Sequence, residues 1–227
     1  MQIKVLTVVF ACLFVLAGTA REAAAQEAGR DDEPAAGQSP YDLKKGTYEL
    51  GFWAGGSPGT TTFFGRSPDR KLLLTAVRAG RVMGSKKHFT FEMTVDVFPY
   101  MRLVQPQESL KLVTDKGDVV NTSSGPDAVG VGISPIGLKF LFRRRARVKP
   151  FVEATGGVLY FERPVPYDAA RNFNYTFDGG AGVQIFSRSR HATTLGYKFH
   201  HISNAYTGRI NPGIDSHVFY AGFSLFR

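Results

Sequence analysis

Residues 88–97 read His-Phe-Thr-Phe-Glu-Met-Thr-Val-Asp-Val, and apolar and polar side chains alternate through the whole stretch. One set of alternate positions is apolar and comprises Phe89, Phe91, Met93, Val95 and Val97. The other set carries the polar side chains of His88, Thr90, Glu92, Thr94 and Asp96. Because successive side chains of a β-strand point to opposite faces, the stretch predicts a strand with one apolar and one polar face.

The same alternation recurs along the chain and predicts eight strands. We expect them at about 46–55, 71–82, 88–102, 128–143, 147–161, 173–186, 191–203 and 214–226. The connections alternate in length. Those near 56–70, 103–127, 162–172 and 204–213 are long, and those near 83–87, 144–146 and 187–190 are short. No long amphipathic helix is evident.

The N-terminus predicts export. Lys4 precedes an apolar run, and Ala23, Ala24 and Ala25 follow in the manner of a cleavage site, so we interpret 1–25 as a signal peptide that is removed. Cleavage after Ala20 also fits. Cys12, the single cysteine, lies within this segment, so the mature chain has no disulfide framework. Residues 26–45 lack periodicity and predict a flexible leader, which leaves 46–227 as the folded domain.

Two architectures accommodate eight alternating strands: a soluble sandwich or lipocalin-like barrel, and an outer-membrane barrel. The polar faces of the strands carry charges that rarely lie in a dry core, namely Glu49, Glu92, Asp96, Lys139, Glu153 and Asp178. Alternating segments, an even strand number, short turns at one end and long loops at the other are typical of the second architecture. We therefore predict an all-β, eight-stranded antiparallel transmembrane β-barrel, integral to the bacterial outer membrane.

The C-terminus and the charge distribution bear on partners. The segment 220–226 resembles the aromatic last strand that outer-membrane proteins present to their assembly machinery, although Arg227 departs from the usual aromatic ending. The net charge is +9, and eleven of the 23 basic residues of 46–227 fall at the predicted periplasmic end. That position favours contact with membrane lipids over nucleic acid, even for the basic run 143–149.

A candidate catalytic site lies near the C-terminus. His201 and Ser203 are two residues apart on one strand face, and Asp215 begins the last strand opposite them. An imidazole in that position can act as general base for the hydroxyl, and the carboxylate can orient the imidazole. Strand parity places all three on the lipid-facing side, where polar groups are costly and mark functional sites. The simpler alternative is a solvated histidine and a turn-capping aspartate.

These residues carry a resemblance to a known family. The stretch 201–205, His-Ile-Ser-Asn-Ala, followed by 211–213, Asn-Pro-Gly, and Asp215, resembles the active-site region of the lipid A 3-O-deacylases. The resemblance implies an outer-membrane barrel that removes an ester-linked 3-hydroxyacyl chain from lipid A without a metal or other cofactor. It implies Ser203 as nucleophile, His201 as base and Asp215 as acid, with Asn204 and Asn211 supporting the site and the oxyanion. The best-known members carry glutamate where Asp215 stands.

In this interpretation the acyl chain lies along the apolar exterior near Tyr197, Phe199 and Phe219. The substrate is lipid A, or lipopolysaccharide, in the outer leaflet. Two other functions remain open from the sequence: an esterase that acts on phospholipid, and a non-catalytic structural, adhesive or porin-like barrel. A soluble lipocalin-like binder is a further alternative.

Overall fold

The computed structural model describes residues 39–114, 117–188 and 190–227. The predicted signal peptide, 1–25, and most of the predicted leader lie outside these residues, so both stay predictions. The described residues form β-strands and contain no helix long and apolar enough to cross a membrane. The strands are β1 (Tyr48–Ser57), β2 (Thr60–Thr61), β3 (Lys71–Ser85), β4 (Phe89–Val104), β5 (Ser109–Val113), β6 (Val119–Ser123), β7 (Ala128–Phe142), β8 (Val148–Val165), β9 (Arg171–Arg188), β10 (His191–Ser203) and β11 (Ile214–Phe226).

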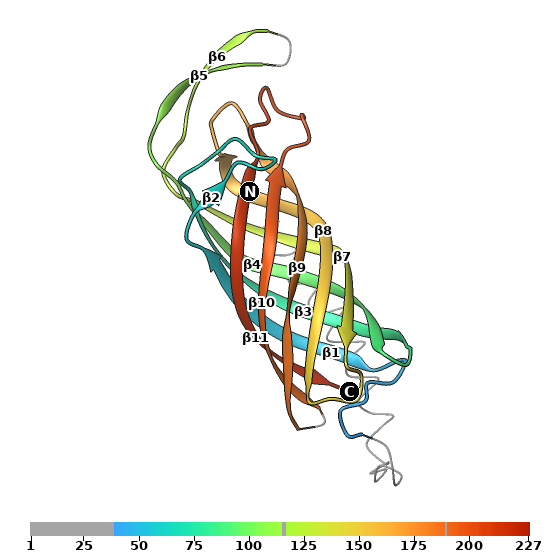
Figure 1. Ribbon diagram of the computed structural model, residues 1–227. Helices are drawn as coiled ribbons and strands as arrows, with labels where there is room; N and C mark the ends of the chain where they lie inside the picture. The colour runs from blue at the N-terminus through green and yellow to red at the C-terminus, as the bar shows by residue number, and fades with distance from the viewer. Residues whose placement is uncertain (1–38, 115–116, 189) are drawn as a thin grey trace. The chain divides into compact units, whose positions relative to one another are not determined.

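Eight of these strands close into an antiparallel barrel in the order β1-β3-β4-β7-β8-β9-β10-β11, with β11 pairing back onto β1 (Figure 1). The predicted antiparallel barrel of eight strands is confirmed, and each predicted strand overlaps an observed one. Closure satisfies the backbone hydrogen bonds of both terminal strands, which a bilayer-spanning sheet requires. It also brings the first outer loop beside the last strand.

The alternation of side chains around the wall follows the predicted parity. On β4, Glu92 and Asp96 point into the lumen and are buried, while Met93 faces outward and is exposed. A register shift opposite β7, between Phe98 and Met101, changes the phase of β4 near its outer end, so that Met101 and Leu103 also point inward. Beyond this bulge, towards the outer end of the barrel, the side chains that β4 points into the lumen are apolar.

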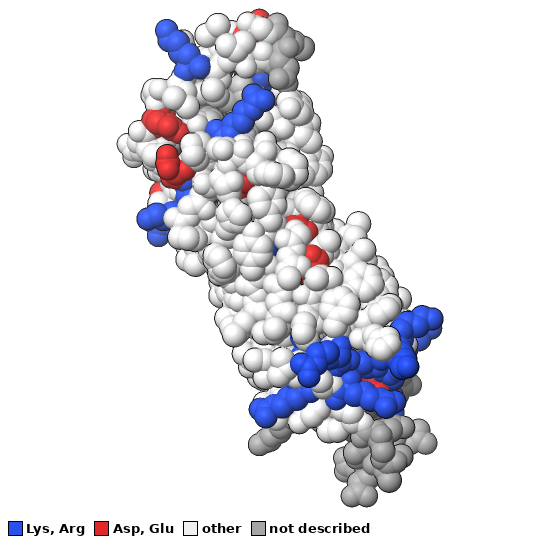
Figure 2. All heavy atoms as spheres, viewed as in Figure 1, with Lys and Arg blue, Asp and Glu red and all other residues white. Residues whose placement is uncertain are grey.

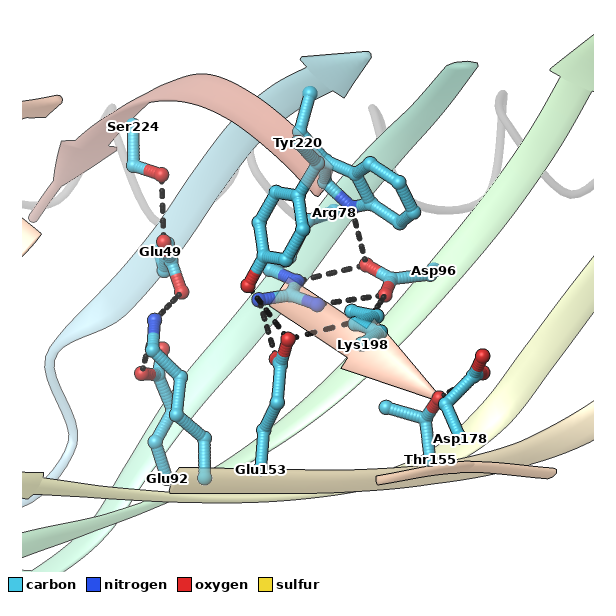
Figure 3. Close-up of polar contacts among 12 residues, drawn as sticks. Glu49, Arg78, Glu92, Asp96, Glu153, Thr155, Asp178, Lys198, Tyr220 and Ser224 are labelled. Atoms are coloured by element: carbon cyan, nitrogen blue, oxygen red, sulfur yellow. Dashed lines mark hydrogen bonds and ion pairs between the residues drawn. The ribbon is translucent and has the colours of Figure 1, made fainter. Parts of the chain in front are cut away.

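The middle of the lumen holds a network of buried charges (Figure 3). Arg78 makes a two-pronged contact with Asp96, at 2.7 Å through each nitrogen, and reaches Glu153 at 3.0 Å. Lys139 lies 3.0 Å from Glu49 and 3.2 Å from Glu92, and Lys198 lies 3.3 Å from Glu153. The Tyr220 hydroxyl donates to Glu153 at 2.6 Å. The lumen therefore compensates most of its charges internally, as the predicted polar lumen requires.

Apolar layers lie on either side of this network. Towards the outer end, the buried cluster includes Leu74, Phe98 and Phe161. At the other end, Val82, Phe186 and Phe226 pack with Leu43. These phenylalanines fill the lumen, whereas most of the described ones face outward as expected. An eight-stranded barrel packed in this way leaves little room for a pore.

Residues 39–45, the last part of the predicted leader, pack at the periplasmic end of the barrel. Leu43 is buried in the apolar cluster there, and its carbonyl accepts a hydrogen bond from the Ser85 hydroxyl at 2.9 Å. Asp42 pairs with Arg144 at 2.5 Å. This part of the segment forms contacts that its composition does not indicate.

Three short strands lie within loops for which the sequence predicts no structure. β2 pairs with the outer end of β11, and β5 pairs with β6 in a hairpin that extends from the outer end of the barrel (Figure 1). At the base of the hairpin the buried Arg70 contacts Glu108 at 3.0 Å and lies 4.9 Å from the centre of the Tyr167 ring. Burial raises the pKa of Tyr167, whose hydroxyl donates to Glu108 at 3.0 Å.

Replacing Arg78 should destabilise the barrel, because it would leave Asp96 and Glu153 buried without their strongest partner. We expect Arg78→Met to lower the free energy of unfolding by about 3–5 kcal/mol. The measurement is guanidinium unfolding of the protein refolded in lipid vesicles. Arg102→Met is the matched control, because the Arg102–Asp127 pair lies at the surface, where solvent and salt screen its charges. Equal losses in the two variants would contradict a stabilising role of the lumen network.

Candidate active site

The predicted histidine and aspartate meet on the outside of the barrel. His201 of β10 and Asp215 of β11 are direct partners in the strand pairing, and His201 Nδ1 lies 2.6 Å from Asp215 Oδ1. Because a carboxylate only accepts, Nδ1 carries the shared proton and Nε2 is left free to accept one. His201 remains partly exposed, as a residue that must reach a substrate has to be.

Asp215 points outward by strand parity, yet it is fully buried. The first outer loop covers it, and the Phe64 and Gly65 backbone N–H groups donate to Asp215 Oδ2 at 2.5 Å and 2.8 Å. With His201, three donors therefore serve one carboxylate. Hydrogen bonds of this kind stabilise the charged form of a carboxylate at the edge of an apolar phase.

Two glycines allow this loop to approach. A Cβ on Gly65 would lie 2.8 Å from the Gly213 carbonyl carbon, so the two backbones touch. Gly213 has φ +62°, a conformation that favours glycine, and a Cβ there would lie 3.3 Å from His201 Cε1. Arg66 N–H donates to the Pro212 carbonyl at 2.5 Å beside this contact. Residues 211–213 therefore form the surface on which the first loop packs.

Ser203 lies on the same outward face of β10, one step beyond His201. The described contacts include no hydrogen bond between the two side chains. Instead, Ser203 Oγ accepts the Ala205 N–H at 3.4 Å. Ala205 and Tyr206 both have positive φ, +49° and +60°, in a tight turn closed by Thr207 N–H to the Asn204 carbonyl at 3.0 Å. Non-glycine residues held in this region are strained, and such strain clusters at functional sites.

The two predicted asparagines hold the loop that follows Ser203. Asn204 is buried, and its Nδ2 donates to the Ile210 carbonyl at 2.8 Å. Asn211 Oδ1 accepts the Asn204 backbone N–H at 3.0 Å. These contacts fit a supporting role for both residues. They use the Asn204 backbone N–H and one of the two hydrogens of its Nδ2.

Aromatic side chains surround His201 on the lipid-facing surface. The rings of Tyr197 and Phe219 lie 5.4 Å apart, and Phe199 lies above them on β10. Phe63 and Phe64 of the first loop add to this surface, with ring centres 6.1 Å and 5.9 Å from Phe199. Together they form an exposed apolar patch beside the histidine.

The loop residues Phe63, Phe64 and Gly65 were not predicted to lie at the site. A signal for them was present, because a closed barrel must place the loop after its first strand next to its last strand. The pairing of Tyr197 with His217 was also not predicted. The Tyr197 hydroxyl lies 2.6 Å from His217 Nδ1 on the outer surface.

A small pocket behind Ser203, lined in part by Pro166, is too tight to admit a water molecule. A substrate therefore has to approach Ser203 from the outer surface.

The exterior of the barrel thus carries a histidine–carboxylate pair with a neighbouring serine, a set of side chains that ester hydrolases use. The family model described as lipid A 3-O-deacylase (PagL) matches residues 93–224, more than half of the chain. The chain therefore belongs to this family of hydrolases.

Several solved structures are similar to this chain. The crystal structure of the outer membrane enzyme PagL matches with a TM-score of 0.50 and 16% identity, over 77% of this chain and 97% of that chain. Neisserial surface protein A (NspA) matches with a TM-score of 0.46 and 12% identity, over 79% and 96%. OprG from Pseudomonas aeruginosa has a TM-score of 0.46 and 11% identity, over 84% and 99%. No curated protein matches the sequence.

The backbone contact between Gly65 and Gly213 can be tested by hydrogen exchange. We expect Gly65→Ala to push the first loop away from Asp215 and to increase the amide exchange rates of Phe64 and Gly65 at least tenfold, because their bonds to Oδ2 are lost. Peptide-resolved exchange with mass spectrometry measures this. Gly59→Ala, whose added Cβ meets nothing within 4 Å, is the control and should leave the rates unchanged. Unchanged exchange in Gly65→Ala would refute the contact.

Proposed function

We propose that the protein is a serine esterase that removes an ester-linked 3-hydroxyacyl chain from lipid A in the outer leaflet. The observation that carries the proposal is the His201–Asp215 pair on the lipid-facing surface beside Ser203, in a chain of this family. A catalytic pair serving a water-soluble substrate would gain nothing from that position. A substrate that lies in the membrane meets it directly.

The first chemical step is attack of Ser203 Oγ on the ester carbonyl carbon. Rotation of the serine side chain away from the Ala205 N–H brings Oγ toward His201 Nε2, which takes the hydroxyl proton. Hydrogen bonds between catalytic groups are often loose before substrate binds. Asp215 stabilises the resulting imidazolium, and its three donors keep it ionised and in position. The C–O bond to the sugar then breaks, and the leaving alkoxide takes the proton from Nε2.

The tetrahedral oxyanion needs donors close to Ser203. The Ala205 N–H is suitably placed, since it already lies 3.4 Å from Ser203 Oγ and becomes free when the side chain rotates. The strained turn at Ala205 and Tyr206 aims this donor. An oxyanion donor of this kind contributes about 100- to 1000-fold to the rate. Water subsequently attacks the acyl-enzyme, with His201 again as base.

The acyl chain lies along the aromatic patch in this proposal. Tyr197, Phe199 and Phe219 supply the barrel side of the contact, as the sequence predicted, and Phe63 and Phe64 supply the loop side. Contact with these rings replaces contact with neighbouring lipid chains, so little new burial is needed. The patch serves to align the ester with Ser203.

The first test is acyl release from lipid A, followed by mass spectrometry with the protein refolded in vesicles. We expect wild type to release one 3-hydroxyacyl chain and Ser203→Ala to lose at least about 10⁴-fold in rate. Ser187→Ala, an exposed serine far from the site, is the control and should retain activity. Parallel vesicles of phospholipid alone separate lipid A from a phospholipid substrate. Release that persists in Ser203→Ala would overturn the proposal, and no release by wild type would favour a non-catalytic barrel.

The second test concerns the acid. We expect Asp215→Asn to lower kcat by about 10⁴-fold, because a neutral amide cannot hold the correct histidine tautomer or stabilise the imidazolium. Asp215→Glu should retain more activity than Asp215→Asn but less than wild type. Its extra methylene pushes the carboxylate into the first loop, where Oδ2 already has donors at 2.5 Å and 2.8 Å. Activity of Asp215→Glu at or above wild type would show that this loop does not set the acid's position.

A further inference from the structure

Lysine and arginine gather at the end of the barrel opposite the candidate active site. Figure 2 shows them in a band across the visible face of this end, while the middle of that face is largely uncharged. The band comes from the end of β3, the short turns and the C-terminus and includes Arg81, Lys86, Lys87, Arg143, Arg144, Arg145, Arg147, Arg190 and Arg227. Among the described residues, the acid at this surface is Asp42, which already pairs with Arg144. The protein therefore leaves most of the band's charge uncompensated.

One part of the band is shaped into a hollow of about 460 Å³. It lies between the β3–β4 turn and the β7–β8 turn, which the Arg143 N–H holds together by donating to the His88 carbonyl at 3.1 Å. The lining residues are Lys87, His88, Phe142, Arg143, Arg144, Arg145 and Ala146. Lys87, Arg143 and Arg145 have no acidic partner in the described part of the chain. Three free cations around one hollow fit a phosphate group.

The wall directly above this hollow is aromatic and faces lipid. Phe142 pairs across the strands with Phe89, and Phe140 pairs with Phe91. The Phe140 ring lies 5.9 Å from Phe89 and 5.0 Å from Phe91, so the four side chains form one column on the outside of β4 and β7. A soluble anion would make no use of this column. A molecule with a phosphate at one end and acyl chains at the other matches both parts.

We propose that this hollow binds the phosphate headgroup of an anionic glycerophospholipid in the inner leaflet, with its acyl chains along the phenylalanine column. Lys87, Arg143 and Arg145 contact the phosphate, and Phe142 separates the polar contact from the apolar one. Basic pockets at the edge of membrane-spanning structure bind such headgroups through these interactions. This site is independent of the esterase proposal, because it lies at the other end of the barrel and shares no residue with it.

Native mass spectrometry of the detergent-solubilised barrel, titrated with phosphatidylglycerol or phosphatidylcholine, tests the site. We expect phosphatidylglycerol to bind at least about tenfold more tightly, and the triple variant Lys87→Gln, Arg143→Gln, Arg145→Gln to lose that preference. The matched control is Arg81→Gln, Arg190→Gln, Arg227→Gln, which removes the same charge from the same band outside the hollow. It should keep the preference. Heat-dependent gel mobility confirms that both variants are folded.

Three outcomes would overturn the proposal. The preference could persist in the hollow variant, or it could fall equally in both variants, which would indicate diffuse attraction to the whole band. Alternatively, glycerol phosphate without acyl chains could compete as well as the lipid, which would indicate a site for a soluble anion. Competition by the intact lipid, but not by glycerol phosphate, supports the role of the phenylalanine column.

Discussion

Every backbone N–H and C=O group of a membrane-spanning sheet needs a hydrogen-bond partner within the protein. No water is available in the hydrocarbon region, so the sheet must close and β11 must pair with β1. Closure fixes more than the wall, because it places the first outer loop against the last strand. The Phe64 and Gly65 N–H groups then lie within reach of Asp215, which would otherwise be a bare carboxylate at the membrane surface. The candidate site therefore depends on contacts between the first outer loop and the last strand.

Carboxylates in the lumen and on the exterior of the barrel have different partners. Those in the lumen, such as Glu153, are balanced by cations, with Arg78 at 3.0 Å and Lys198 at 3.3 Å. Asp215, on the exterior, has no lysine or arginine among its described contacts and is held by N–H donors. This difference suits their tasks. A lysine or arginine paired with Asp215 would compete with His201 for the carboxylate. Neutral N–H donors position Asp215 without that competition, so in the proposed mechanism the His201 imidazolium is the cation that Asp215 stabilises.

Period-two alternation sufficed to locate all eight barrel strands, because one face of each strand meets lipid and the other meets the lumen. Parity alone also predicted that His201, Ser203 and Asp215 lie on one exterior surface. It could not reveal β2, which has two residues, or the bulge near Phe98, because neither leaves a periodic signature. The approach of Gly65 to Gly213 joins residues far apart in sequence, and closure predicts only that their loops are neighbours. The roles of Asn204 and Asn211 in holding the 204–211 loop likewise follow from its three-dimensional path.

The inner and outer ends of the barrel together determine the depth at which Ser203 lies in the membrane. β10 runs 13 residues, from His191 at the inner end to Ser203 at the outer end. At about 3.3 Å per residue and a tilt of about 40°, this strand rises roughly 30 Å, close to the thickness of the hydrocarbon core. Ser203 therefore lies where acyl chains meet headgroups. A vertical slip of one residue pair, about 5 Å, would carry it away from the ester. A basic inner end bound to phosphate headgroups, with aromatic side chains directly above it, opposes that slip. The proposed headgroup site would therefore help to hold Ser203 at the level of the ester in the proposed substrate.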